Sequence, residues 1–285
     1  MTITFAVKWD DGGAIVADRQ TTQDEEKTYG VKIEVVRHYE TPVFLMGGAF
    51  LMGGAGITHF LDKAREELYC SIKKSAGNTD FEDGKWKGFV VNSLDRAIVK
   101  YTTLKNRKKQ QERKEYVKDS RFVFIGSNEE GRIMIHCSES ERVLEYRENI
   151  FYSIGSGASN AIDAVDERFK NSKRERLSPV ERVRAALHGV EVACLEDLYC
   201  SGTVDMIIMQ GDRAYTPEVE NVTLSRRLNN QESLKVLRGS VINDAIERLL
   251  FEEKNIFEVE ESLKRRTQMS QHQNLNRIFR GYSLQ

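Results

Sequence analysis

The first residues of the chain carry groups suited to nucleophilic chemistry. Met1 precedes Thr2, and Thr2 is small enough that we expect the initiator methionine to be removed. Thr2 would then carry a hydroxyl and a free α-amine on one residue. An α-amino group has a pKa of about 8, so part of it is a free base near neutral pH. A neighbouring amine is one recognised way to activate a hydroxyl, which is a poor nucleophile alone.

A β-hairpin is predicted directly after this residue. Two short runs rich in β-branched and aromatic residues lie between residues 2 and 19, and they flank Asp10-Asp11-Gly12-Gly13. Such a sequence favours a turn, in which we expect the glycines to supply the positive φ. Ala17-Asp18-Arg19 closes the hairpin.

The rest of the chain alternates between strand pairs and helices. Expected strands lie at residues 31–36, 121–127, 132–136, 143–146, 150–154 and 204–209, and expected helices at 57–75, 161–169 and 178–195. The last helix begins with Ser178-Pro179-Val180-Glu181, a capping box with proline at the first helical position. Residues 89–94 fit either a helix or an extended segment. This order favours an α+β layered domain.

Five features in this order resemble the proteasome β-subunit and the HslV-type peptidase, which are N-terminal-nucleophile (Ntn) hydrolases. They are Thr2 with Ala17-Asp18-Arg19 and Thr21-Thr22, then Lys32, the glycine-rich segment from Gly47, Gly155-Ser156-Gly157, and residues 197–202. The resemblance spans roughly residues 2–218. It implies a four-layer αββα sandwich with two stacked antiparallel sheets, and the activity of a threonine-type peptidase.

The resemblance also implies the roles of the residues nearest the nucleophile. The Thr2 hydroxyl would attack the scissile carbonyl, with the Thr2 α-amine as base. Lys32 would lower the pKa of that amine or hydroxyl by its positive charge, and Asp18 would pair with Lys32. A backbone amide at Gly47 would donate to the oxyanion. Taken alone, Lys32 also fits an ordinary lysine on a surface strand.

Three further residues would support Thr2 through hydrogen bonds, again by resemblance: Ser156, Asp197 and Ser201. Gly155-Ser156-Gly157 alone also fits a phosphate-binding loop, but the lysine of a Walker motif is missing. No metal or organic cofactor is expected. The five histidines show no metal-ligand spacing, and we assign none of them a role.

An internal repeat complicates the assignment of the oxyanion glycine. Phe-Leu-Met-Gly-Gly-Ala occurs at residues 44–49 and again at 50–55. Deleting one copy restores the spacing of the family, in which an apolar strand ends in glycine shortly before a helix. Gly47 fits best by its separation from Lys32, and Gly53 is the rival. A purely structural glycine turn is the third interpretation.

Composition excludes several other classes of protein. The 285 residues are 40% hydrophobic and 31% charged, with a formal net charge of −1, so bulk charge gives no reason to expect nucleic acid. No apolar run is long enough to cross a membrane, and Trp9-Asp10-Asp11 interrupts the N-terminus before a signal peptide could form. Four cysteines without zinc-site spacing favour a cytoplasmic protein with reduced thiols.

Two charged or amphipathic regions lie outside the resemblance. Residues 105–118 are rich in lysine and arginine, which fits a solvated helix or loop better than a nucleic-acid surface, because only Tyr116 interrupts the charges. Beyond residue 218, we expect a helical C-terminal extension over 219–285, with helices at 233–251 and 257–266 and a polar tail at 268–285.

Partners and alternatives follow from the resemblance. Members of the family assemble into rings that receive substrate from an ATP-driven unfoldase. We therefore expect a homo-oligomeric ring, a peptide or unfolded-protein substrate and an ATP-dependent unfoldase as a possible partner. A catalytically silent structural subunit is one alternative, favoured if Met1 is retained. An Ntn amidohydrolase acting on small amides is another, and a nucleic-acid-binding module is the most remote.

Overall fold

The computed structural model describes residues 3–18, 20–23, 26–29, 33–36, 50–75, 86–104, 106–128, 131–138, 142–146, 149–170, 174–196, 204–211, 213–233 and 237–280. Its strands are β1 (Ile3–Trp9), β2 (Gly12–Asp18), β3 (Gln20–Gln23), β4 (Glu26–Tyr29), β5 (Ile33–Val36), β6 (Phe50–Ala55), β7 (Arg121–Asn128), β8 (Gly131–Ser138), β9 (Arg142–Tyr146), β10 (Phe151–Gly155), β11 (Val204–Gln210) and β12 (Arg213–Tyr215). Its helices are α1 (Thr58–Ser75), α2 (Trp86–Thr102), α3 (Arg107–Lys118), α4 (Ala158–Arg168), α5 (Pro179–Glu196), α6 (Val219–Ser233), α7 (Gly239–Leu250), α8 (Ile256–Arg266) and α9 (His272–Arg280), with short 3₁₀ turns η2 (Arg174–Arg176) and η3 (Met269–Gln271).

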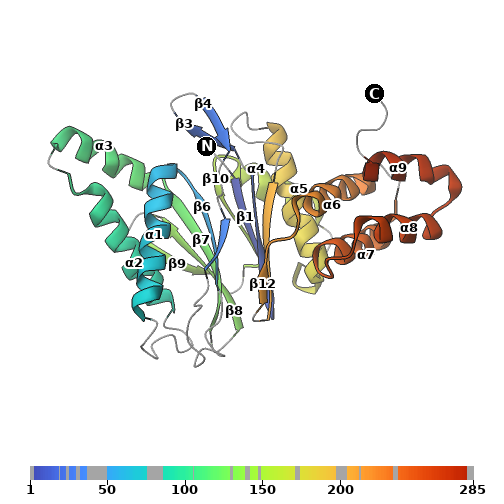
Figure 1. The fold of residues 1–285 in the computed structure, drawn as a ribbon, viewed down its shortest axis with the longest axis horizontal. Coiled ribbons are helices and arrows are strands. Elements are labelled where there is room, and N and C mark those ends of the chain that lie inside the picture. The colour runs from blue at the N-terminus through green and yellow to red at the C-terminus, as the bar shows by residue number, and fades with distance from the viewer. Residues whose placement is uncertain are drawn as a thin grey trace.

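These elements form the expected four layers (Figure 1). One sheet has the order β10-β1-β2-β11-β12, and the other has the order β5-β6-β7-β8-β9, with every pairing antiparallel. Helices α4 and α5 cover the outer face of the first sheet, and α1 and α2 cover that of the second. The α+β, αββα prediction is therefore confirmed.

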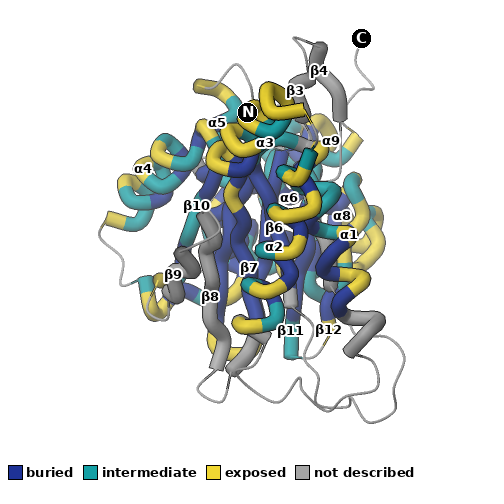
Figure 2. Tube along the Cα trace, turned by 90° about the vertical axis from the view of Figure 1, so that its left-hand side faces the viewer, coloured by how far each residue is buried: buried dark blue, intermediate teal, exposed yellow. Residues whose placement is uncertain are grey.

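A separate apolar core lies in each interface between layers. Ala6, Ile15, Leu51, Val123 and Ile207 are among the residues that fill the space between the two sheets. Figure 2 shows the central strands as buried, with exposed residues gathered on the helices outside them. Strands β1 and β2 are buried along their whole length. Because alternate strand residues face opposite sides, both faces of these two strands are therefore covered by other layers.

The N-terminal hairpin is confirmed, but the reason for its glycines differs from the prediction. Asp10 and Asp11 form the turn, and Trp9 pairs with Gly12. Among the described glycines, positive φ angles occur at 56, 155 and 211, not at 12 or 13. A Cβ on Gly12 would lie 2.1 Å from the Met209 backbone oxygen. Glycine is required there by close packing rather than by φ.

The second copy of the repeated hexapeptide forms β6. Residues 50–53 of this copy pair with β5 on one side, and residues 51–55 pair with β7 on the other. Gly56 and Ile57 connect β6 to α1, which agrees with the predicted order of strand, glycine and helix. The first copy, residues 44–49, lies outside the described residues.

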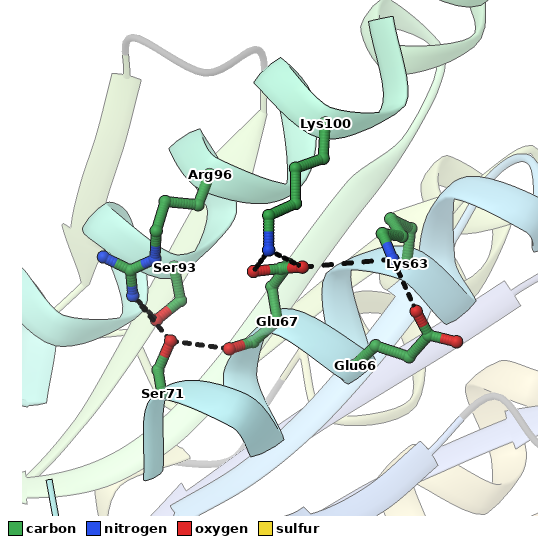
Figure 3. A network of polar contacts seen from close by, with 7 residues as sticks. All are labelled: Lys63, Glu66, Glu67, Ser71, Ser93, Arg96 and Lys100. Atoms are coloured by element: carbon green, nitrogen blue, oxygen red, sulfur yellow. Dashed lines mark hydrogen bonds and ion pairs between the residues drawn. The ribbon is translucent and has the colours of Figure 1, made fainter. Parts of the chain in front are cut away.

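Helices α1 and α2 pack through an apolar seam and a polar network (Figure 3). The Glu67 carboxylate is buried, and Lys100 Nζ donates to its two oxygens at 2.6 and 2.8 Å. Arg96 donates to the hydroxyls of Ser71 and Ser93 at 2.6 and 3.1 Å. The ambiguous residues 89–94 therefore belong to a helix, α2.

The basic run forms α3, which projects beside α2 (Figure 1). The Asn106 side chain caps it by accepting from the amides of Lys108 and Lys109. Arg113 lies over the Tyr101 ring, 4.6 Å from its centroid, and holds the helix against α2. Most other α3 side chains are exposed, as expected for a solvated helix.

The C-terminal extension is more helical than predicted. Residues 219–233 form α6, which the sequence analysis missed, and the next helix begins at 239 rather than 233. The polar tail contains α9, whose Leu275 and Ile278 are buried. These helices extend outward from α5 and share one continuous core with the first sheet (Figure 1). The boundary at residue 218 stays a prediction.

Candidate active site at the N-terminal end of β1

Asp18 is fixed beside the start of the chain by the hairpin register. Thr4 pairs with Ala17, so Ile3 lies opposite Asp18 at the open end of the hairpin. The Ile3 backbone N–H donates to Asp18 Oδ1 at 2.9 Å, and Asp18 is 1% exposed. Ile3 directly follows Thr2, which lies outside the described residues. The structure therefore places Asp18, a predicted site residue, against the backbone amide of Ile3, which follows the predicted nucleophile in the sequence.

Ser156 lies on the other side of the same strand end. Strand β10 pairs with β1 so that Gly155 is opposite Ile3. Gly155 has φ of 109°, a conformation that favours glycine, and it turns the chain from β10 towards α4. Ser156 follows immediately and is exposed. The Gly-Ser-Gly segment is thus a turn between strand and helix beside Ile3, as the sequence predicted.

Other predicted residues are adjacent in sequence to this region but lie outside the described residues. Strand β11 begins at Val204, which pairs with Asp18, and residues 197–203, with Asp197 and Ser201, precede it. Lys32 precedes Ile33, which pairs with Gly53. Gly47 belongs to the first copy of the repeat. The roles of Lys32, Gly47, Asp197 and Ser201 therefore stay predictions.

Gly53 and Gly54 bring the second sheet against β1. Thr4 Oγ1 donates to the Gly54 carbonyl at 3.0 Å, and both residues are buried. A Cβ on Gly53 would lie 2.6 Å from Thr4 Cγ2. Close packing between the sheets therefore requires glycine at 53. The rival glycine thus contacts a residue that lies two positions along the chain from Thr2.

Thr4 is the residue of this region that the sequence analysis missed. It is fully buried, it bonds to β6, and its carbonyl accepts from the Ser153 hydroxyl at 3.3 Å. The sequence feature that could have identified Thr4 is a hydroxyl residue between Ile3 and Phe5, in a strand that is buried on both faces. Such a residue needs a hydrogen-bond partner.

The other end of β1 is held by a different group. Arg182 on α5 donates to the carbonyls of Lys8, Glu175 and Leu177 at 2.7 to 2.9 Å. Burial lowers the pKa of this guanidinium, while Asp10 and Glu175 oppose the effect. Arg182 anchors β1 to α5 far along the strand from Ile3 and takes no part in the candidate site.

The described residues contain no group of three or more His, Cys, Asp or Glu side chains that could hold a metal ion. They also contain no helix long and apolar enough to cross a membrane. The described groups that meet at this end of β1 are the buried Asp18 carboxylate and the turn at Gly155-Ser156-Gly157.

Solved structures with the same fold include Anbu proteins. Anbu, described as an ancestral β-subunit, from Yersinia bercovieri aligns over 84% of this chain and 98% of its own, with a TM-score of 0.59 and 12% identity. An Anbu Gly-1 mutant from Hyphomicrobium sp. strain MC1 aligns over 82% and 98%, with a TM-score of 0.58 and 14% identity. HslV from Trypanosoma brucei aligns over 73% and 99%, with a TM-score of 0.48 and 16% identity.

Comparison of the sequence with known proteins identifies no relative. No family model matches the chain, and no curated protein matches it. The similarity at 12 to 14% identity is one of fold. The chain shares its fold with the Anbu proteins.

Proposed function

We propose that this protein is a threonine-type Ntn peptidase whose nucleophile is the hydroxyl of Thr2 after removal of Met1. The observation that carries the proposal is the buried Asp18 carboxylate, bonded to the Ile3 amide directly after Thr2. A buried charge is costly unless it is paired and hydrogen-bonded. A buried Asp18 carboxylate next to the predicted α-amine of Thr2 fits a catalytic site that contains other charged groups.

The proposed reaction begins when Thr2 Oγ attacks the scissile carbonyl and its proton passes to the α-amine. The resulting oxyanion accepts from the backbone amide of Gly47, and collapse of the tetrahedral intermediate leaves an ester on Thr2. The leaving amine takes the proton. Water, deprotonated by the same α-amine, then hydrolyses the ester and restores the free terminus.

The other residues would tune or hold these groups. Lys32 would lower the pKa of the amine or hydroxyl through its charge, with Asp18 as its partner. Ser156, Asp197 and Ser201 would orient the terminus by hydrogen bonds. In support, β2, β10 and β11 each have an end at this point: Asp18 ends β2, Gly155 ends β10, and Val204 begins β11.

The proposed substrate is a peptide or an unfolded protein, admitted to a ring of identical subunits by an ATP-dependent unfoldase. The fold supports this because it is shared with the Anbu proteins, one of which is described as a β-subunit. A ring would enclose the site and restrict it to extended chains. Size-exclusion chromatography with light scattering would give the number of subunits.

The decisive experiment is the intact mass and N-terminal sequence of the purified protein, before and after treatment with a peptide epoxyketone or β-lactone. We expect a terminus at Thr2 that gains one inhibitor mass. Thr2→Ala should abolish that gain, whereas Thr4→Ser, two residues further along the chain and fully buried, should retain it.

Other outcomes would support the alternatives. A retained Met1 without adduct would contradict the peptidase and favour a structural subunit, because a capped amine cannot act as the base. An adduct without cleavage of casein or fluorogenic peptides, together with hydrolysis of small amides, would favour an amidohydrolase. Each result selects one function.

A further inference from the structure

The duplicated hexapeptide gives β6 two equivalent sources of sequence. Residues 44–49 and 50–55 both read Phe-Leu-Met-Gly-Gly-Ala. The second copy occupies the strand, between β5 and β7. A shift of six residues is even, so every side chain would keep its face of the sheet. The first copy could therefore fill every position of β6 with the same residue type.

The demanding positions of β6 would be satisfied by either copy. Leu51 is fully buried between the sheets, and Gly53 leaves no room for a Cβ beside Thr4. In the shifted register, Leu45 and Gly47 would take these places. Packing within the strand therefore cannot decide between the copies.

The residue after the strand does discriminate. Gly56 has φ of 137°, a conformation almost restricted to glycine. A Cβ there would lie 2.5 Å from both Cα and Oγ of Ser120, whose Oγ accepts from the Ile57 amide at 3.2 Å. Ser120 Cα is backbone and cannot turn aside. In the shifted register this position would be occupied by Phe50, which fits neither the φ nor the space.

We infer that Gly56, against Ser120, is the positioning residue that selects the second copy of the repeat for β6. Because the two copies are identical, the sequence of the strand favours neither register, and the single residue that follows each copy decides between them. Gly56 follows the second copy and Phe50 follows the first. The selection is thus encoded outside the strand, at its corner with α1.

The register also decides which glycine faces β1, and on which side of β6 the six residues of the other copy lie. In the observed register, Gly53 and Gly54 contact Thr4 and Leu61, and two residues connect β6 to α1. In the shifted register, Gly47 would face Thr4, and six more residues would enter that corner. Insofar as it concerns the oxyanion glycine, this consequence rests on the proposed function, whereas the register itself does not.

Engineered disulfides in the full-length chain can report the register directly. Ala55 pairs with Arg121, which is exposed, and the first copy ends in Ala49. Directly opposed strand residues lie within disulfide reach. Ala55→Cys/Arg121→Cys, the observed-register pair, reports the present pairing. Ala49→Cys/Arg121→Cys, the shifted-register pair, reports the alternative. The linked peptides are identified by mass spectrometry, which separates them from the native cysteines.

The test variant exchanges the two residues that follow the copies, Phe50→Gly/Gly56→Phe. In the parent chain we expect the observed-register pair to form its disulfide in higher yield. In the exchanged variant the shifted-register pair should do so, with the ratio of the two yields inverted by a factor of about 10 or more. Leu61→Ala is the control for destabilisation, since it weakens the α1 packing without changing either following residue. It should leave the observed-register pair dominant.

A chain with one copy, deletion of 44–49, cannot shift. Gly56→Phe in that chain should lower the melting temperature more than Phe50→Gly/Gly56→Phe does in the full chain. The inference is overturned if the observed-register pair stays dominant in the exchanged variant. It is equally overturned if that variant is destabilised as much as the single-copy variant, or fails to fold. None of these readouts depends on peptidase activity.

Discussion

The amide of Ile3 and the carboxylate of Asp18 meet across the open end of the β1–β2 hairpin, with N and Oδ1 2.9 Å apart in a fully buried environment. This bond ties the last residue of β2 to the first described residue of β1. Asp18 therefore has a structural role that is independent of catalysis. Any test of its proposed role in the reaction must separate the two.

Two substitutions of Asp18 make that separation. Asp18→Asn keeps an oxygen that can accept from Ile3, whereas Asp18→Ala leaves a buried amide unpaired at a cost of about 1–3 kcal/mol in the free energy of unfolding. We expect Asp18→Asn to be the more stable of the two in urea unfolding. Both should slow epoxyketone modification of Thr2 severely. Asp18→Asn modified at the parental rate would show that the charge is not needed.

The β-branched and aromatic runs around Asp10-Asp11-Gly12-Gly13 predicted the N-terminal hairpin, and the order of strands and helices predicted a layered α+β domain. The four-layer αββα arrangement was expected from the resemblance. The Ile3–Asp18 bond follows from the register of the hairpin once the turn is placed at Asp10 and Asp11. The contact of Thr4 with Gly54 could not be predicted in this way. It joins residues 50 apart in sequence and depends on how the two sheets stack.

The missed helices have a physical reason of the same kind. Helix α6 buries the polar residues Asn221, Ser225 and Asn229 together with Val222, Leu224 and Leu228, so its buried face is a mixture of polar and apolar residues. Asn229 accepts from Arg184 at 3.0 Å and donates to the Arg184 carbonyl at 3.0 Å. These buried polar residues between α5 and α6 interrupt the hydrophobic periodicity on which the prediction depended.

Glycines 12 and 88 should respond to alanine in opposite directions. A Cβ at Gly12 would meet the Met209 carbonyl at 2.1 Å and Trp9 Nε1 at 2.5 Å, so Gly12→Ala should lower the free energy of unfolding by about 1–3 kcal/mol. Gly88 lies exposed in α2 with nothing within 4 Å of such an atom. Gly88→Ala should raise stability by up to about 1 kcal/mol. Guanidinium unfolding of both variants measures this, and equal losses would contradict it.

Removing both partners of the Glu67–Lys100 ion pair should cost less stability than removing Lys100 alone. Lys100→Met leaves a buried carboxylate with Lys63 Nζ 3.9 Å away, which should cost about 1–3 kcal/mol. Glu67→Leu/Lys100→Met removes both charges, so no buried carboxylate is left without its partner, and Lys100 is itself 54% exposed. We expect the double variant to be more stable than Lys100→Met. Urea unfolding in a double-mutant cycle with Glu67→Leu gives the coupling energy, and simple additivity of the single losses would contradict the expectation.

His188 on α5 should make stability fall in acid. Burial, with Arg168 as a second cause, lowers the pKa of His188 from 6.5 to about 4, and Glu191 opposes the shift. The folded state therefore binds fewer protons than the unfolded chain between these values, so the free energy of unfolding falls as the pH drops from about 6.5 to 4. One pKa unit corresponds to about 1.4 kcal/mol, and since the ring is partly exposed we expect a total of about 1–2 kcal/mol.

Replacing the ring isolates this contribution from that of the carboxylates, which also titrate in acid. His188→Gln cannot take up the proton, so its stability should decline less steeply than the parent's over the same interval. The measurement is urea unfolding at half-unit steps from pH 7 to pH 4, with the exposed His59→Gln as the matched control. Parallel curves for the parent and His188→Gln would mean that the folded protein accommodates the charged ring, through movement of the Arg168 side chain away from it.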